Sequence, residues 1–230
     1  MSAVRQGKIN MINTVFFDVG GTLVDFPNMF HYFAEIIGEG KTEIEQYIMD
    51  EFLSEYNKIG NEESFFRSVE EILTTVLSQA SKVFDIYDIS DDCGYHYTHL
   101  ATELSQLYPD TVPILDYFKN QNIALYVASD ADAPLLYRQL QQLDIFSFFN
   151  GFIISSEVQA YKPSNKFVEA SSKYVSIPDC CLFVGDSEVD VKTGKKLGVK
   201  TVHKKDITKN PHSADFTISQ LSQLIELIDV

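Results

Sequence analysis

Five polar side chains that could carry phosphoryl chemistry stand at or shortly after the ends of short apolar segments. They are Asp18, Ser129, Lys162, Asp186 and Asp190. A carboxylate is a poor nucleophile toward a phosphate dianion because like charges repel, and a divalent cation held by hard oxygen ligands removes that repulsion. Three carboxylates, one ammonium group and one hydroxyl at a single site would therefore suit a phosphoryl group together with Mg²⁺.

Asp18 is the strongest candidate for the nucleophile. It follows the β-branched and aromatic segment 14–17, which indicates a buried strand, and Gly20 and Gly21 would let the backbone approach a ligand closely. A lone aspartate in such a turn would more often be a structural cap. Because the other polar groups follow later strands in the same way, the catalytic interpretation is favoured over that one, and over a simple ion pair of Lys162 with a carboxylate.

Strand-like runs and helical patterns alternate along much of the chain. Strands are predicted at 14–17, 123–128, 152–154, 181–184 and 199–202, and helices at 111–120, 133–143, 164–174, 188–197 and 218–228. Nearly uninterrupted apolar runs indicate strands covered on both faces, which implies parallel pairing. The fold class is therefore α/β, a doubly wound parallel sheet whose ligands bind beyond the carboxyl ends of the strands, where the strand order reverses.

Residues 25–108 break this alternation because they carry only helical periodicity, with Ile44 and Ile48 on one helical face. Such a unit, inserted directly after the loop of the first strand, would stand over the strand ends. We therefore predict a helical cap domain at 25–108 and a core domain made of 1–24 and 109–230. The first dozen residues are expected to form a loose extension.

The composition narrows the classes of partner. The 18 basic and 33 acidic residues give a formal charge of -15, which would repel nucleic acid. No apolar run approaches the ~20 residues of a membrane span and no secretory signal begins the chain, so we expect a cytoplasmic protein without a membrane partner. The lysine-rich stretch 192–209 is interpreted as a solvated helix face and loop. Cys93, Cys180 and Cys181 lack zinc-site spacing and are expected to be reduced thiols.

Four motifs, in order along nearly the whole chain, carry a family resemblance. They are DVGGTL at 18–23, VASDAD at 127–132, EVQAYKP at 157–163 and VGDSEVD at 184–190. With these motifs the chain resembles the haloacid dehalogenase-like superfamily, in the branch whose helical cap is inserted after the first strand. One such motif alone would be a weak sign, whereas four in this order are specific.

The resemblance implies a Mg²⁺-dependent hydrolase, in the first place a phosphatase acting on a small phosphorylated metabolite. It implies that Asp18 attacks phosphorus and becomes an aspartyl-phosphate, that Ser129 hydrogen-bonds the phosphoryl oxygens and that Lys162 offsets negative charge. The implied metal site comprises Asp18, the main-chain carbonyl of Gly20, Asp186 and Asp190, the last of which would orient a metal-bound water or the lysine. The implied substrate-binding residues are Gly21, Thr22, Ser129, Asp130 and Lys162.

The chain departs from the family's phosphatases at Gly20. The resemblance places there a second aspartate, which protonates the leaving oxygen and then activates water, a contribution of ~10²–10⁴-fold in rate. Glycine cannot move a proton, so we expect weak activity toward alkyl phosphates and better activity toward aryl or acyl phosphates. Asp25, Asp130 and Asp132 are the nearby acids, and we favour a loop residue for the first and helix capping for the other two.

The same departure keeps three alternatives open. The halide-removing enzymes of the family also lack the second aspartate, but they need no metal, and Asp186 and Asp190 argue for Mg²⁺. The branch that cleaves carbon–phosphorus bonds needs a cap lysine, and Lys41, Lys58 and Lys82 lie in the predicted cap. A protein without turnover could survive as a phosphate-ligand or protein-binding module.

The polar and aromatic side chains of the predicted cap cannot be assigned to the substrate from the pattern alone, because such residues at helical spacing usually form a core. They are His31, Tyr32, Arg67, Tyr95, His96, Tyr97 and His99.

Overall fold

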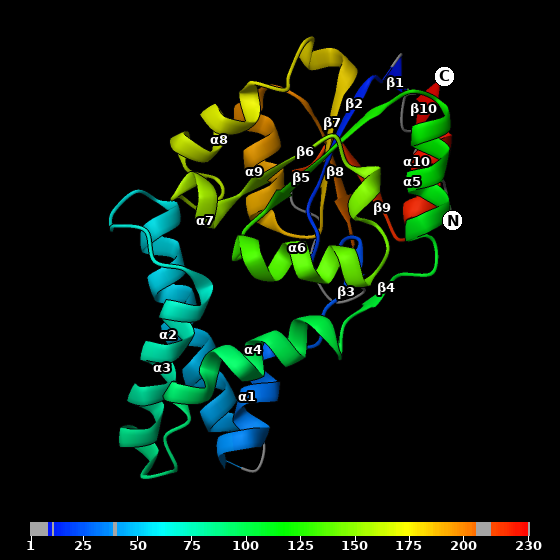
Figure 1. The fold of residues 1–230 in the computed structure, drawn as a ribbon. Helices are drawn as coiled ribbons and strands as arrows, with labels where there is room; N and C mark the ends of the chain where they lie inside the picture. The colour runs from blue at the N-terminus through cyan, green and yellow to red at the C-terminus, as the bar shows by residue number, and fades with distance from the viewer. Residues whose placement is uncertain (1–8, 11, 39–40, 206–212, 230) are drawn as a thin grey trace, which may run out of the picture.

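The computed structural model of the protein describes residues 9–10, 12–38, 41–205 and 213–229. Its centre is a six-stranded sheet in the order β6-β5-β2-β7-β8-β9, with every neighbouring pair parallel (Figure 1). The strands are β2 (Thr14–Phe17), β5 (Ala124–Ser129), β6 (Gly151–Ile154), β7 (Cys181–Gly185), β8 (Lys200–Lys204) and β9 (Phe216–Ile218). The order reverses at β2, and the predicted doubly wound α/β fold is confirmed.

Helices cover both faces of this sheet. Because successive strand residues point to opposite faces, Val15 and Phe17 of β2 pack on one side and Phe16 on the other. The first side is covered by α5 (Thr111–Asn120), α6 (Ala133–Gln142) and α10 (Leu224–Leu227). The second is covered by α8 (Asn165–Ser172) and α9 (Glu188–Leu197). A short helix, α7 (Ser155–Val158), follows β6.

The segment between the first two sheet strands is helical and stands over the carboxyl ends of the strands (Figure 1). Its helices are α1 (Met29–Gly38), α2 (Thr42–Gly60), α3 (Val69–Phe84) and α4 (Cys93–Thr102), which share a hydrophobic cluster of their own. The chain leaves the core and returns to it through the antiparallel pair β3 (Val24–Asp25) and β4 (Gln106–Leu107). We call α1–α4 the cap; the domain boundary at 25–108 stays a prediction.

The end of the chain differs from the prediction. The helix predicted over 218–228 is wrong, because this segment holds the end of β9, a 3₁₀ turn at Leu221–Gln223, the four-residue α10 and β10 (Ile228–Asp229). Its leucines are spaced by three residues and are buried against the core. This spacing is compatible with a long helix and equally with the short turn that the structure has. β10 pairs with β1 (Ile9–Asn10) inside the predicted N-terminal extension, and residues 1–8 and 11 of that extension lie outside the described residues.

The cysteines and the lengths of the helices bear on two further properties of the chain. Cys93, Cys180 and Cys181 are all free thiols, and burial raises the pKa of Cys93 to about 11, as expected for an unreactive core thiol. Within the described ranges, no helix combines the length and apolar character that crossing a membrane requires.

The central strand supplies a test of the fold. Phe16 is fully buried and stacks with Tyr126 and Phe183 at ring-centroid distances of 5.6 and 6.0 Å. We expect Phe16→Ala to lower the free energy of unfolding by about 3–5 kcal/mol, because it leaves a cavity at the centre of the sheet. Phe65→Ala is the matched control, since Phe65 is 94% exposed and its loss should change little. Urea denaturation followed by circular dichroism measures both, and equal midpoints for the two variants would contradict this packing.

Candidate active site

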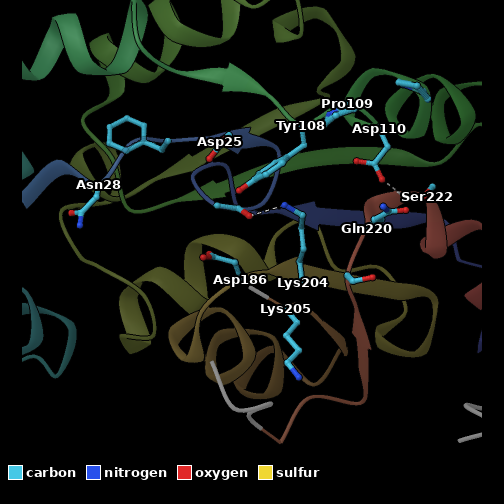
Figure 2. A pocket seen from close by; sticks show the side chains of 14 residues that line it. Asp25, Asn28, Tyr108, Pro109, Asp110, Asp186, Lys204, Lys205, Gln220 and Ser222 are labelled. Atoms are coloured by element: carbon cyan, nitrogen blue, oxygen red, sulfur yellow. Dashed lines mark hydrogen bonds between the residues drawn. The ribbon is translucent and has the colours of Figure 1, made fainter. Parts of the chain in front are cut away.

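The carboxyl edge of the sheet brings together side chains from three strands. Asp18 follows β2, Ser129 ends β5, and Asp186 follows β7, where it lines an open pocket together with Lys204 (Figure 2). Asp18 and Ser129 are buried, with 8% and 5% of their surface exposed, and Asp186 is half-buried. The parallel sheet therefore places the predicted groups at the switch point of the strand order.

Lys162 is the buried cation of this edge. Its Nζ lies 2.8 Å from Asp18 Oδ1 and 2.5 Å from Asp190 Oδ1, and it also donates to the Ala128 carbonyl at 3.1 Å. Burial lowers the pKa of Lys162, but the carboxylates of Asp18, Asp190 and Asp130 outweigh it and raise the pKa well above the usual range. The lysine is thus a permanent positive charge between two carboxylates.

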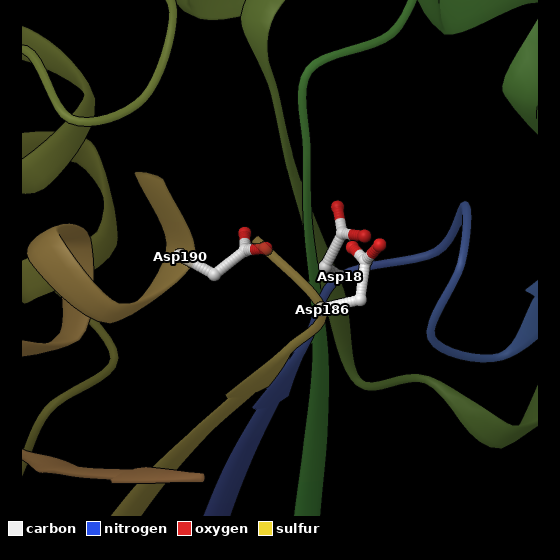
Figure 3. A group of neighbouring side chains, drawn as sticks. All are labelled: Asp18, Asp186 and Asp190. Carbon is white, nitrogen blue, oxygen red and sulfur yellow. The ribbon is translucent and has the colours of Figure 1, made fainter. Parts of the chain in front are cut away.

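Asp18, Asp186 and Asp190 can each direct one carboxylate oxygen to a common point, since these oxygens all lie within 4.8 Å of one another. In Figure 3 the carboxylates of Asp18 and Asp186 are neighbours, and Asp190 approaches from α9. The Oδ2 atom of Asp190 already accepts from the backbone N–H and the hydroxyl of Ser187, in the capping box that begins α9. Hard carboxylate oxygens are the kind of ligand that Mg²⁺ prefers.

Burial raises the pKa of Asp18 well above the usual range for a carboxyl, although the Lys162 ammonium opposes the shift. The charges of Asp190 and Asp186 raise this pKa further. A cation between Asp18 and Asp186 would favour the ionised form that a nucleophile needs. The electrostatics of the described residues therefore fit the predicted metal, which would lie where negative charge is in excess.

Close approach in the loop after β2 depends on glycine. Gly21 has φ +77°, and a Cβ atom there would come within 2.3 Å of Asp186 Oδ2. Gly20 is different, because an added Cβ would meet only the Cβ atom of Phe26 at 3.9 Å. Thr22 is buried, and its hydroxyl donates to Asp18 Oδ2 at 3.5 Å. Position 20 therefore has room for the Cβ atom of a side chain.

The two aspartates after Ser129 correct the helix-capping interpretation. Asp130 caps no helix; its Oδ1 accepts from the Lys162 backbone N–H at 2.9 Å and its Oδ2 from the Tyr56 hydroxyl of the cap. Asp132 is the N-cap residue of its own helix α6, as predicted, but its side chain instead caps the cap helix α3, through the backbone N–H groups of Val69 and Glu70 at 3.1 and 3.0 Å. Both carboxylates thus tie the cap to the core, a long-range role that local sequence does not encode.

A cavity of about 280 Å³ lies between the cap and this edge of the sheet. Asp18, Gly20 and Ser129 line its floor together with Asp130, and the cap contributes side chains such as Phe52. Among the unassigned polar residues of the cap, Tyr97 also lines this cavity. A group attached to Asp18 would occupy this cavity.

The position of Lys204 beside the site was not predicted from the sequence. The interpretation of 192–209 as a solvated helix face and loop is wrong for this residue, which ends β8 and is only 6% exposed. Its Nζ donates to the Gly21 carbonyl at 2.9 Å and lies 3.0 Å from the ring centroid of Tyr108 (Figure 2). Its position at the end of a buried strand could have indicated this role. The neighbouring lysines made the stretch resemble a solvated surface instead.

The fold and the site together define a capped α/β hydrolase. A family model described as haloacid dehalogenase-like hydrolase matches residues 12–198. The chain therefore belongs to the haloacid dehalogenase-like hydrolases, as the four motifs predicted.

Two curated relatives are phosphatases. The glyceraldehyde 3-phosphate phosphatase of Methanopyrus kandleri is 27% identical over 156 residues, which cover 62% of this chain and 66% of that protein. The phosphoglycolate phosphatase of Aquifex aeolicus is 27% identical over 137 residues, which cover 58% of this chain and 64% of that protein. The chain thus spans slightly less than two thirds of the length of these relatives.

Solved structures share the fold over almost the whole chain. The L-2-haloacid dehalogenase from Xanthobacter autotrophicus, with chloropropionic acid covalently bound, has a TM-score of 0.73 at 17% identity and covers 94% of this chain and 98% of its own. YfnB from Bacillus subtilis, described as a HAD-hydrolase bound to magnesium, has a TM-score of 0.77 at 17% identity and covers 96% and 100%. At this identity the likeness concerns the fold.

Asp130 provides a pH test of the site. Burial raises its pKa from 3.8 to about 6 in the folded state, so ionisation of this carboxyl opposes folding above about pH 6 and no longer does so as the pH falls toward 3.8. Asp130→Asn cannot ionise. We expect the stability of this variant relative to the parent protein to increase from about pH 4 to about pH 7, measured by urea denaturation in EDTA. Parallel pH profiles would contradict the assignment of this titration to Asp130.

Proposed function

We propose that the protein is a Mg²⁺-dependent phosphatase that acts on a small phosphorylated metabolite through an aspartyl-phosphate on Asp18. The observation that carries the proposal is the cluster of Asp18, Asp186 and Asp190 at the switch point of the sheet, in which Asp18 and Asp190 both pair with the buried ammonium group of Lys162. The phosphatase relatives support the substrate class, because both are named for small phosphate esters.

Asp18 and Asp186, with the main-chain carbonyl of Gly20, would hold Mg²⁺. When bound, the ion supplies the positive charge that lets a carboxylate meet a phosphate dianion. Asp190 is assigned the second of its two expected roles, orienting the lysine, since one of its oxygens accepts from Lys162 and the other from Ser187. The capping box of α9 fixes this carboxylate, and through it the ammonium group.

The reaction then has two displacements at phosphorus. In the first, an oxygen of Asp18 attacks phosphorus and the bond to the leaving oxygen breaks, while Ser129 and Lys162 bind the equatorial phosphoryl oxygens. Water then attacks the phosphorus of the aspartyl-phosphate, which releases phosphate and restores the carboxylate. The loop at Gly21 and Thr22 holds Asp18 in place, and the cap excludes bulk water during the first step.

Two rival activities differ in their support. A carbon–phosphorus hydrolase would need a cap lysine over Asp18, but Lys41, Lys58 and Lys82 are all exposed, and none lines the cavity of the described structure. A dehalogenase keeps the support of the structural neighbours, and release of chloride from 2-chloropropionate in EDTA would reveal it. The carboxylate cluster favours the phosphatase.

Hydrolysis of p-nitrophenyl phosphate and acetyl phosphate, with and without Mg²⁺, tests the proposal. We expect both compounds to be cleaved by the parent protein with Mg²⁺ and neither to be cleaved in EDTA. Asp18→Asn should reduce the rate to background, and far-ultraviolet circular dichroism should show that this variant is folded. If the parent cleaves neither compound faster than Asp18→Asn does, the protein is a binding module instead.

Gly20 generates a second prediction. Without an acid at this position, kcat should fall steeply as the pKa of the leaving group rises, so aryl and acyl phosphates should outpace alkyl phosphates. Gly20→Asp fits the available space and should raise kcat for an alkyl phosphate by roughly tenfold or more, with little change for acetyl phosphate.

Gly20→Asn is the matched control, because it has nearly the same shape and no proton to donate. A flat dependence of kcat on leaving-group pKa in the parent would show that another group already supplies the proton. Equal effects of the Asp and Asn substitutions would show that the gain, if any, is steric.

A further inference from the structure

The side chains that line the cavity above Asp18 indicate which organic group the substrate carries. On the sheet side, Asp18 and Asp190 are occupied by the ammonium group of Lys162. The cavity of about 280 Å³ lies on the opposite side, toward the cap, and Asp18, Gly20 and Ser129 line its floor. A phosphoryl group seated at Asp18 would therefore direct its organic substituent into this space between the cap and the sheet.

The walls of the cavity are mainly apolar and aromatic. Phe26 and Met29 come from the start of the cap, Phe52 from α2 and Tyr97 from α4, while Leu135 of α6 closes the core side. Burying an organic group against such walls is favourable by about 25 cal/mol for each Å² of apolar surface removed from water. Flat aromatic side chains also give a ring-sized substituent partners for stacking.

The charged side chains that line the cavity are all acidic. Besides Asp18 they are Asp130 and Asp132, and no lysine, arginine or histidine belongs to the lining formed by the described residues. An anionic group in this space would lie beside the carboxylates of Asp130 and Asp132, and no cationic side chain of the lining could pair with it. The lining therefore opposes a substrate that carries a carboxylate.

Three cationic side chains of the cap pair with glutamates outside the cavity. Arg67 and Lys58 both bind Glu55, at 3.3 and 2.6 Å, and His31 lies 2.9 Å from Glu45. Lys204 and Lys205 line the neighbouring pocket, which contains neither Asp18 nor Ser129.

We infer that the preferred substrate is a phosphate monoester whose organic part is uncharged, apolar and about the size of one aromatic ring, and that the cavity discriminates against esters bearing a carboxylate. This inference rests on the proposed function and names the substrate class of the same site. It separates the protein from relatives named for carboxylate substrates, such as the phosphoglycolate phosphatases and the haloacid dehalogenases. An aryl leaving group also needs no proton, which agrees with Gly20.

A matched pair of esters tests the inference. 4-Carbamoylphenyl phosphate and 4-carboxyphenyl phosphate have nearly the same shape and similar leaving groups, but only the second carries an extra negative charge. We expect kcat/KM of the parent protein to be at least tenfold higher for the amide. The same pair, titrated calorimetrically into Asp18→Asn with Mg²⁺, should show the same order of affinity without any turnover.

Met29 offers a charge-reversal variant. It lines the cavity from the half-buried first residue of α1, so a long side chain can enter there without disturbing the catalytic edge. Met29→Lys should reduce the preference for the amide several-fold by supplying a cation, and Met29→Gln, the uncharged control, should leave it unchanged. Acetyl phosphate hydrolysis reports whether both variants remain active and folded.

The outcomes separate the two proposals. Absence of hydrolysis with both esters and with acetyl phosphate refutes the phosphatase, while the affinities for Asp18→Asn still decide what the cavity prefers. Equal or tighter binding of the carboxylate ester overturns the inference whatever the turnover. So does an unchanged preference in a Met29→Lys protein that retains acetyl phosphate hydrolysis.

Discussion

The site depends on the neutralisation of several carboxylates that lie close together in a buried place. Asp18, Asp190 and Asp130 all act on the pKa of one ammonium group, Lys162, and Asp186 stands beside Asp18. Carboxylates at this separation repel strongly where water is excluded, so the arrangement is stable only if cations and hydrogen-bond donors neutralise it. The lysine, the capping box of α9 and the N–H and O–H donors around Asp130 provide part of this neutralisation. A divalent ion would provide the rest.

The core of the fold and the catalytic edge could be predicted from the sequence because both depend on local patterns. A buried strand followed by Asp18 and glycines, or by Gly185 and Asp186, can only present its acids at the carboxyl end, and parallel pairing then brings these ends together. The C-terminal segment could not be predicted in the same way, because leucines spaced by three residues satisfy both a helix and a short turn packed on the sheet. There, long-range pairing of β9 with β8 decided the outcome.

The roles of Asp130, Asp132 and Lys204 could not be predicted from the sequence for another reason. Their partners lie far away along the chain: Tyr56 for Asp130, the start of α3 for Asp132, and Gly21 for Lys204. An aspartate after a strand caps its own helix in most local contexts, whereas these two hold the cap helices over the site. The walls of the cavity are formed by side chains of both the cap and the core. The substrate preference therefore could not be predicted from the sequence either.

The proposed mechanism requires that Asp18 becomes phosphorylated during turnover. The parent protein can be quenched in acid during hydrolysis of acetyl phosphate with Mg²⁺, and its peptides analysed by mass spectrometry. We expect the added mass of one phosphoryl group on the peptide that contains Asp18, lost on treatment with hydroxylamine and absent when Mg²⁺ is replaced by EDTA. Turnover with no phosphorylated peptide, or with the phosphoryl group on another residue, would contradict this mechanism.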